Sequence, residues 1–490
     1  MGVLAGAASA ASSALAAPPV ASLRPVLRGA EFFKRAVPDL AAIIRDKKLT
    51  GTVTYAVADV ATGRWLECVD EHRGIPPASV TKAITALYAL DVLGPLHRFE
   101  TRVLATGGIS NGEVLGDLIL VGGGDPTLDT NGMAALAAKV KEAGIIGVKG
   151  GFKVYQGDLP ALRQIDPEQP DHVGYNPAVS GLALNFNRVH FEWKRASGHY
   201  AVSMEARSDR YRPAVGMAVM SVVDRKAPVY TYEDRGGKDR WTVAKGALGK
   251  GGSRWLPVRR PAVYAGEVFA TMLGAHGIRV KRAEVIDALP ETEQIAVLRS
   301  GPLSGILKDM LRFSTNLTAE MVGLSATLKR RGEAADLAAS AAEMNAWARD
   351  TLRMRAPQLV DHSGLGDASR LMAVDMTRAL VAAKDAGLRP ILKKFQMRDA
   401  QGKPQKDHPV AVDAKTGTLN FVSALAGYMT VRNGTELAFA IFAANEGLRA
   451  EIPREARERP PGARTWNRRA KQVQQALIER WDALFAARKS

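Results

Sequence analysis

The chain has 490 residues, of which 46% are hydrophobic, so it is long enough for two or three domains and too apolar to be disordered. Its formal net charge of +17 favours anionic surroundings, but without a nucleic-acid-binding motif or a lysine tract we expect no nucleic-acid partner. The single cysteine, Cys68, cannot form a disulfide within the chain, and without a tight histidine cluster it leaves no structural zinc site.

Residues 1–17 are small and mostly apolar, and their end, Ala14-Leu15-Ala16 before Ala17-Pro18, is typical of the cleavage site of an export signal. No lysine or arginine precedes this stretch, so a disordered alanine-rich terminus remains the alternative. No segment carries 18 strongly apolar residues in a row, and we predict no helix that spans a membrane.

The first elements predicted after this segment are a hairpin and a helix. Residues 51–60 and 65–69 are strand-like and flank a turn, which predicts a β-hairpin. Pro76-Pro77 then breaks the chain. Ser79 opens a stretch with apolar side chains at helical spacing, which ends at Gly94-Pro95 and predicts a helix with a serine at its N-terminus.

The middle of the chain has a different texture. From about residue 98 to 295, short strand-like runs alternate with glycine and proline, and residues 188–256 are especially polar, with charges of both signs. We therefore predict that 98–295 is an inserted region and that 188–256 forms a smaller subdomain within it. Because strands and a helix precede the insertion and helices and strands follow it, residues 30–97 and 296–490 are expected to build one discontinuous α+β domain.

The last third of the chain contains helical texture over 302–384, a strand over 410–414, and two strand-like runs around Asn433-Gly434, a strong hairpin signal. A final helix is predicted over about 466–487. It could pack on a sheet or lie on an anionic membrane, and we favour packing because its apolar stripe is narrow. That stripe consists of Val473, Leu477, Trp481 and Leu484.

Three short motifs occur once each, in one order, on a predicted helix, loop and strand. They are Ser79-Val80-Thr81-Lys82, Ser314-Thr315-Asn316 and Lys415-Thr416-Gly417. Each alone is weak, because a helix cap, a loop or a polar strand end would account for it. The ordered set predicts an acyl-transfer site with a serine nucleophile and a lysine base.

The roles follow from residue chemistry. Ser79 and Lys82 lie one helical turn apart, so the lysine can take the proton of the serine hydroxyl. A free lysine has a pKa of about 10.4, so burial and a second cation, for which Lys415 is the candidate, would have to lower it. Ser314 would relay a proton to the leaving group. Asn316 would bind a substrate amide carbonyl and help to hold Lys82.

The third motif, extended by Thr418, suits substrate binding. A strand edge can pair with an extended peptide, and Gly417 would let the substrate backbone approach closely. Lys415 and the hydroxyls of Thr416 and Thr418 suit a terminal carboxylate. The backbone N–H groups of Ser79 and Thr418 could form an oxyanion hole.

These residues resemble the penicillin-binding protein and serine β-lactamase superfamily. The long stretch between the first two motifs narrows the resemblance to the D-alanyl-D-alanine carboxypeptidase/endopeptidase family, the class C low-molecular-mass penicillin-binding proteins, over roughly residues 35–450. Two positions depart from the usual pattern, Thr315 and His362. The matches that support the resemblance are Gly116-Asp117-Leu118, Val121-Gly122-Gly123-Gly124-Asp125-Pro126-Thr127-Leu128, Ser314-x-Asn316-x-x-Ala319-Glu320 and Asp361-His362-Ser363-Gly364-Leu365.

The resemblance implies a fold with an antiparallel sheet, helices on both of its faces and a helical subdomain. It implies a periplasmic or exported enzyme that cleaves the terminal D-Ala of peptidoglycan stem peptides, or the D-Ala–diaminopimelate cross-link between them, and that β-lactams acylate. It implies neither a metal nor a cofactor. The alternatives are a β-lactamase or esterase on the same fold, a non-catalytic wall-binding protein, and a membrane-surface protein acting through its C-terminal helix. The sequence leaves the oligomeric state and the balance of the two activities open.

Overall fold

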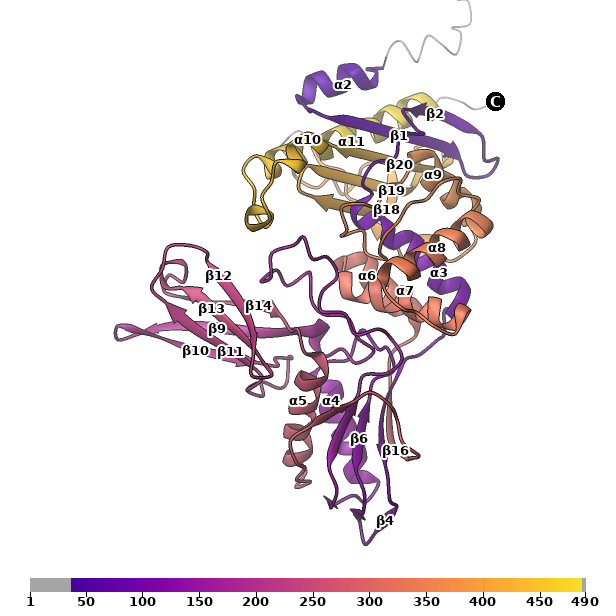
Figure 1. The fold of residues 1–490 in the computed structure, drawn as a ribbon. Helices are drawn as coiled ribbons and strands as arrows, with labels where there is room; N and C mark the ends of the chain where they lie inside the picture. The colour runs from indigo at the N-terminus through magenta and orange to yellow at the C-terminus, as the bar shows by residue number, and fades with distance from the viewer. Residues whose placement is uncertain (1–36, 400, 487–490) are drawn as a thin grey trace, which may run out of the picture.

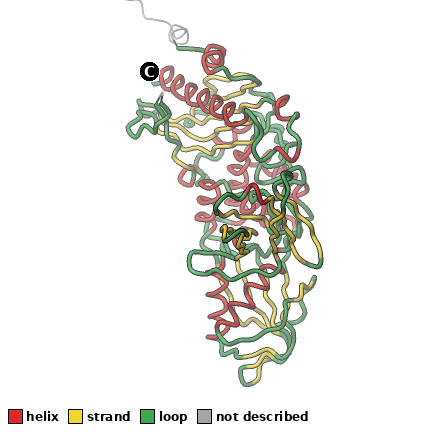
Figure 2. Tube along the Cα trace, turned by 90° about the vertical axis from the view of Figure 1, so that its left-hand side faces the viewer, coloured by secondary structure: helices red, strands yellow, loops and turns green. Residues whose placement is uncertain are grey.

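The computed structural model describes residues 37–399 and 401–486, so the signal-like segment 1–17 lies outside the described residues. The molecule is elongated, with a large sheet and its helices toward one end and the inserted region toward the other (Figures 1 and 2). Among the described helices, none is long and apolar enough to cross a membrane.

The main sheet is antiparallel and has the strand order β17-β18-β19-β20-β1-β2. The predicted hairpins are confirmed: β1 pairs with β2, and β19 pairs with β20 across the Asn433-Gly434 turn. The strands are β1 (Thr52–Asp59), β2 (Trp65–Val69), β17 (Lys393–Lys394), β18 (Ala411–Leu419), β19 (Val422–Thr430) and β20 (Glu436–Ala444).

Helices cover both faces of this sheet, which is why its central strands are apolar in consecutive positions. Side chains alternate between the faces along a strand. One face carries small residues such as Ala426 and Ala440 and packs against a helical subdomain, while the other carries larger ones such as Phe439 and Ile441. The helices of this part are α2 (Leu40–Lys47), α3 (Thr81–Leu93), α6 (Leu303–Phe313), α7 (Asn316–Arg331), α8 (Leu337–Leu352), α9 (Ala373–Ala382), α10 (Glu446–Ala450) and α11 (Ala463–Phe485).

The C-terminal helix α11 packs on the sheet, as favoured from its stripe. Val473, Leu477, Trp481 and Leu484 are all buried in the cluster that α11 forms with α2 and the sheet. The Trp481 indole N–H donates to Glu67 Oε2 at 2.9 Å, which anchors the helix to β2. The apolar stripe of α11 is therefore part of the protein's hydrophobic core.

Trp481→Ala is expected to lower the free energy of unfolding by about 3–5 kcal/mol, because it opens a large cavity between α11 and the sheet. Lys471→Ala, on the exposed side of the same helix, is the matched control and should change it by no more than about 0.5 kcal/mol. Denaturant unfolding measures both. A Trp481→Ala protein as stable as wild type, and weaker sedimentation with anionic vesicles, would favour the membrane interpretation.

The inserted region has its own five-stranded sheet, in the order β15-β8-β6-β3-β16, with α4 (Thr130–Glu142) and α5 (Pro261–Ala275) in the same hydrophobic cluster. Because β16 pairs with β3 up to Arg299, the region closes on itself a few residues beyond the predicted boundary at 295. The strands are β3 (Glu100–Ala105), β6 (Leu118–Val121), β8 (Phe152–Tyr155), β15 (Glu284–Ile286) and β16 (Glu293–Arg299), with a small sheet of β4 (Ile109–Ser110), β5 (Glu113–Val114) and β7 (Gly147–Val148).

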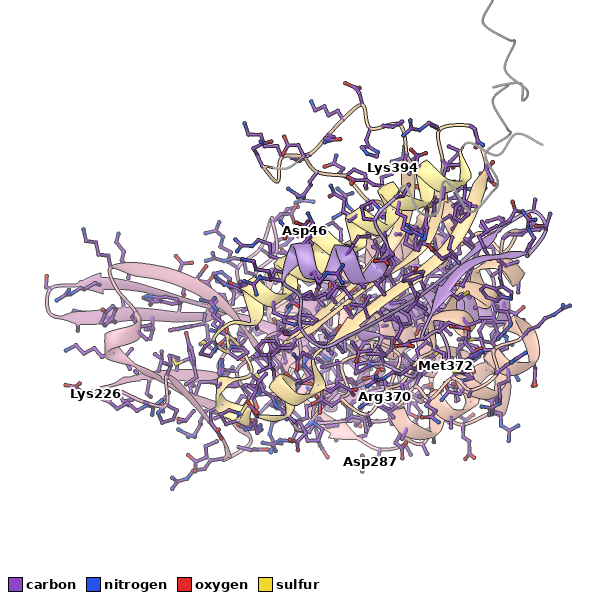
Figure 3. All side chains as sticks on the ribbon, turned by 90° about the horizontal axis from the view of Figure 1, so that it is seen from above. Asp46, Lys226, Asp287, Arg370, Met372 and Lys394 are labelled. Atoms are coloured by element: carbon purple, nitrogen blue, oxygen red, sulfur yellow. The ribbon has the colours of Figure 1, made fainter. Side chains whose placement is uncertain are left out.

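Two three-stranded sheets fill most of residues 188–257, where the nested subdomain was predicted. Seen from above, they extend away from the main sheet, with Lys226 toward their far end (Figure 3). The first sheet has the order β10-β9-β14 and the second β11-β13-β12. Their strands are β9 (Arg188–Ala196), β10 (His199–Glu205), β11 (Ala218–Val223), β12 (Tyr230–Arg235), β13 (Lys238–Ala244) and β14 (Gly251–Pro257).

The expectation that residues 98–295 stand apart from the catalytic part needs one correction. A loop of the inserted region, over residues 156–187, packs on helix α7 through its own hydrophobic cluster. Leu159, Ile165 and Val179 of the loop share this cluster with Leu317 and Met321 of α7. Since α7 begins at Asn316, the loop supports one of the three motifs directly.

Candidate active site

The first motif lies at the junction of a tight turn and helix α3. Ser79 is in a 3-10 turn, η1 (Ala78–Val80), immediately before α3 rather than at the start of the α-helix itself. The turn brings Ser79 and Lys82 to the same side, and the Lys82 Nζ lies 3.0 Å from the Ser79 Oγ. The predicted pairing of these two side chains is present.

Lys82 is fully buried and held by three oxygen atoms. Besides Ser79 Oγ, its Nζ lies 2.7 Å from Asn316 Oδ1 and 2.7 Å from the backbone oxygen of Ser363. Burial lowers the pKa of Lys82 to about 8, while the carboxylates of Glu320 and Asp361 oppose this shift. The neutral, basic form of the amine is therefore accessible near neutral pH.

Lys415 was expected to lower the pKa of Lys82, and the structure changes that account. Burial is the main cause of the shift at Lys82. The repulsion between the two amines instead lowers the pKa of Lys415. Burial is the largest cause of that low pKa, and the charges of Lys82 and Lys393 lower it further.

The second and third motifs meet in a second serine–lysine pair. Ser314 ends helix α6 in a left-handed conformation, which turns the chain sharply before α7. Its Oγ accepts a hydrogen bond from Lys415 Nζ at 3.0 Å, and the same Nζ donates to the backbone oxygen of Thr416 at 2.6 Å. Two hydroxyl–amine pairs therefore border the same site.

Asn316 holds Lys82 through its side-chain oxygen, as predicted. Its amide nitrogen donates to the backbone oxygen of Tyr175 at 2.9 Å. Tyr175 belongs to the loop of the inserted region that packs on α7. No sequence signal marked it, because the contact uses its backbone and depends only on tertiary packing.

The Lys415–Thr418 motif lies in the second half of β18. Among the described residues, β17 pairs with β18 at Asp413 and Ala414, and the Phe395 N–H donates to the backbone oxygen of Val412, so the edge lacks a strand partner beyond Ala414. Thr416 and Thr418 are exposed there. This supports the predicted edge at which an extended peptide can pair.

Gly417 packs closely against the turn that carries Ser79, besides lying where substrate approach was predicted. It is buried, and a Cβ there would lie 2.7 Å from the backbone oxygen of Pro77 and 3.1 Å from the Cβ of Ala78. The glycine therefore allows the turn that carries Ser79 to pack tightly against β18. A larger residue would push the nucleophile away from the strand edge.

A cavity of about 320 Å³ joins these parts. Ser79, Ser314, Asn316 and Thr418 all line it. Its remaining wall comes from segments that the motifs did not indicate, including charged side chains of the C-terminal segment. These lining residues include Gln169, Tyr175, Asp367, Arg449, Arg457 and Glu458.

One group of metal-ligand side chains lies close together in the part of the chain that the structure describes, and it lies in the inserted region. It consists of His190, Glu192 and Glu205. Arg207 Nη2 lies 2.5 Å from Glu192 and 2.7 Å from Glu205, so a guanidinium already neutralises both carboxylates. We therefore assign no metal to this group.

Comparison with known proteins now decides the family. Residues 36–460 match the model of the D-Ala-D-Ala carboxypeptidase 3 (S13) family. The chain belongs to this family. It is thus a D-Ala-D-Ala carboxypeptidase by class and a serine hydrolase.

The alignments of this S13 carboxypeptidase with two of its relatives cover most of both chains. The D-alanyl-D-alanine carboxypeptidase of Actinomadura sp. (strain R39) is 28% identical over 443 residues, covering 82% of this chain and 80% of the relative. The D-alanyl-D-alanine carboxypeptidase DacB of Haemophilus influenzae is 25% identical over 389 residues, covering 74% and 79%.

The fold agrees with the family. The crystal structure of penicillin-binding protein 4 from Haemophilus influenzae superposes with a TM-score of 0.71, covering 90% of this chain and 99% of that one. The sequences of the pair are 18% identical, so this likeness speaks for the fold alone. The predicted α+β architecture of a penicillin-binding protein with a large insertion is confirmed.

Proposed function

We propose that Ser79 is the nucleophile and Lys82 the general base of a D,D-peptidase that cleaves the terminal D-Ala, or a D-Ala cross-link, of peptidoglycan stem peptides. One observation carries the proposal. Ser79 Oγ lies 3.0 Å from the buried Lys82 amine, in a cavity beside an open strand edge. That geometry lets the amine take the hydroxyl proton as the oxygen attacks a peptide carbonyl.

The remaining steps use the second pair. When the acyl-enzyme forms, the C–N bond breaks and the leaving amine needs a proton, which Ser314 supplies through its contact with Lys415. Water then attacks the ester and passes a proton through Ser314 back to Lys415, while Lys82 returns the proton it took to the departing Ser79 oxygen. Ser79 and Thr418 both line the cavity, and we propose that their backbone N–H groups bind the oxyanion of each tetrahedral intermediate.

The substrate orientation follows from the strand edge. An extended stem peptide pairs with β18 beyond Ala414, where the edge is open. Lys415 and the exposed hydroxyls of Thr416 and Thr418 then bind its terminal carboxylate. The diaminopimelate carbon that bears the amide of a cross-link carries a carboxylate as well, so the same contacts suit both substrates.

The function is tested by supplying both substrates to the purified protein. We expect release of D-Ala from a pentapeptide stem, or cleavage of purified cross-linked muropeptides, together with a stable penicillin ester on the intact protein. Fast release of hydrolysed penicillin without peptidase activity would support a β-lactamase instead. Failure to form the ester would contradict the proposal altogether.

Export follows from the substrate, since peptidoglycan lies outside the cytoplasmic membrane. We therefore propose a periplasmic or exported location, with stem peptides as substrates and β-lactams as acylating inhibitors. The net charge of +17 suits an anionic wall. Fractionation of cells that produce the full chain tests the location, and recovery of the active protein in the cytoplasm would contradict it.

We propose that the inserted region governs access of the wall substrate while its loop over 156–187 also supports the site. Replacing residues 98–295 by a short linker is therefore expected to lower the melting temperature and to slow acylation by penicillin, because α7 loses its packing partners. Trimming the Gly236-Gly237 turn between β12 and β13 is the control and should leave both unchanged. Wild-type acylation in the excised protein would show that the loop is dispensable.

A further inference from the structure

The catalytic lysine is held from behind by a loop that none of the three motifs contains. The loop spans residues 361–366, and its Ser363 backbone oxygen accepts a hydrogen bond from Lys82 Nζ at 2.7 Å. A backbone carbonyl cannot adjust on its own as a side chain can. Its position on Lys82 therefore depends on what fixes the loop.

Two buried carboxylates fix it. Glu320 of helix α7 is fully buried, and each of its oxygens accepts one backbone N–H at 2.9 Å, Oε2 from His362 and Oε1 from Ser363. Asp361 does the same further along, accepting from Gly364 at 2.6 Å and from Gly366 at 2.7 Å. Glu320 thus binds the N–H of Ser363, the same residue whose carbonyl oxygen accepts the hydrogen bond from Lys82.

The opposite side of the loop contacts helix α3 and the turn before it, which carries Ser79. Thr85 Oγ1 donates to the backbone oxygen of His362 at 2.7 Å. Gly364 has a φ of 74°, and a Cβ there would lie 1.9 Å from the backbone oxygen of Ala78. The loop is therefore clamped between α7 and the start of α3.

We propose that Glu320 is a positioning residue for Lys82: it seats the Ser363 carbonyl on the amine and places a negative charge behind the base. The inference rests on the proposed role of Lys82. It adds a residue that touches neither the substrate nor the nucleophile and acts through the loop.

The chemistry of the site explains why a glutamate is needed here. Two adjacent backbone N–H groups require two acceptors, and a carboxylate supplies both. A glutamine would accept one of these bonds and direct its own NH₂ group at the other donor. The buried N–H left without an acceptor destabilises the loop, which can restore a partner for it only by moving.

The charge has a second effect, on the proton affinity of the base. Lys82 faces Glu320 from α7, Asp361 from the loop and Lys415 from β18; Asp166 of the inserted region acts on Asp361. His362 contributes no charge, because burial lowers its pKa to about 3. Burial, and then the charge of Asp361, raise the pKa of Glu320 itself, while its two N–H donors and the Lys82 cation favour the carboxylate. In its ionised form Glu320 raises the pKa of Lys82, so removing this charge lowers that pKa and leaves more of the amine neutral at a given pH.

The experiment measures the rate of acylation by penicillin in Glu320→Gln across the pH range around the Lys82 pKa of about 8. The rate of wild type rises with pH as Lys82 loses its proton. In Glu320→Gln we expect the midpoint of this rise to move down by about one unit, since one nearby charge is lost. The plateau should fall by about tenfold or more, because a misplaced catalytic group costs up to about 100-fold.

The chain offers a matched control in Glu267 of α5, which also accepts two adjacent backbone N–H groups, those of Gly216 and Met217. Glu267→Gln should lose similar hydrogen bonds and leave the pH midpoint and the plateau unchanged. Glu320→Asp keeps the charge and both acceptors on a shorter side chain. We expect it to lower the plateau while its midpoint stays close to that of wild type.

A Glu320→Gln protein with the wild-type profile, or with a lower plateau and an unmoved midpoint, overturns the proposal. If that variant does not fold, Glu320→Asp decides, because a wild-type plateau there shows that the seating of the loop is not needed. Lys82→Ala, measured in parallel, separates the two levels of inference. Full acylation in Lys82→Ala contradicts the proposed base itself, whereas its loss beside a normal Glu320→Gln contradicts only the role of Glu320.

Discussion

Ser79→Ala is expected to abolish both the penicillin ester and the release of D-Ala, because no other hydroxyl pairs with the buried Lys82 amine in the described site. The fold should remain, since the serine side chain makes one hydrogen bond whose loss costs about 1 kcal/mol. Intact-protein mass spectrometry after incubation with penicillin measures the adduct, and thermal melting checks the fold.

Ser314→Ala is the matched control for this result. It also removes a hydroxyl bonded to a lysine in the same cavity, but it leaves the proposed nucleophile in place. We expect its adduct to form more slowly and at the same site. An adduct of full yield in Ser79→Ala would sink the assignment of the nucleophile.

Lys82→Ala is expected to lower the rate of acylation by about 10²–10⁴-fold, the usual contribution of a general base. The reason is direct, since the amine is the base in contact with Ser79 Oγ. The second-order rate of penicillin acylation at neutral pH measures this loss. Acylation of Lys82→Ala at the wild-type rate would require another base.

Lys415→Ala completes this prediction. It removes the partner of Ser314 and the cation proposed for the substrate carboxylate, so acylation should fall here too. The pH midpoint should move little, because burial and not Lys415 is the main cause of the low pKa of Lys82. Lys393→Ala, an exposed lysine on the neighbouring β17, is the control and should acylate normally.

The parts of the site that a local pattern specifies were predictable from sequence. The spacing of Ser79 and Lys82 follows from one helical turn, and their contact is present. The Ser314–Lys415 contact depends on the packing of α6 against the sheet, yet both residues were identified because each lies in a motif of its own. The hairpins and the C-terminal helix followed from turn residues and apolar periodicity.

The parts that depend on backbone groups or on close approach were not predictable. The carbonyls of Ser363 and Tyr175 hold Lys82 and Asn316, and a backbone oxygen has no sequence signature. The packing of Gly417 against the turn before α3 was not foreseen, because that turn lies far away in sequence. Glu320 was noted only as part of a resemblance, since nothing local shows that it accepts two N–H groups of a distant loop.

The pairing of β1 with β20 has a consequence for how the enzyme folds. The two strands are in register from Thr52 opposite Ala444 to Asp59 opposite Leu437, so the first hairpin finds its second neighbour only near the end of the chain. Such distant pairing makes assembly slow, because a long loop must close before its contacts form. The inserted region shortens that loop by folding on itself, with β3 beside β16. Acylation by penicillin would thus report on the completed chain, since a polypeptide that lacks its last strands has the nucleophile without the site.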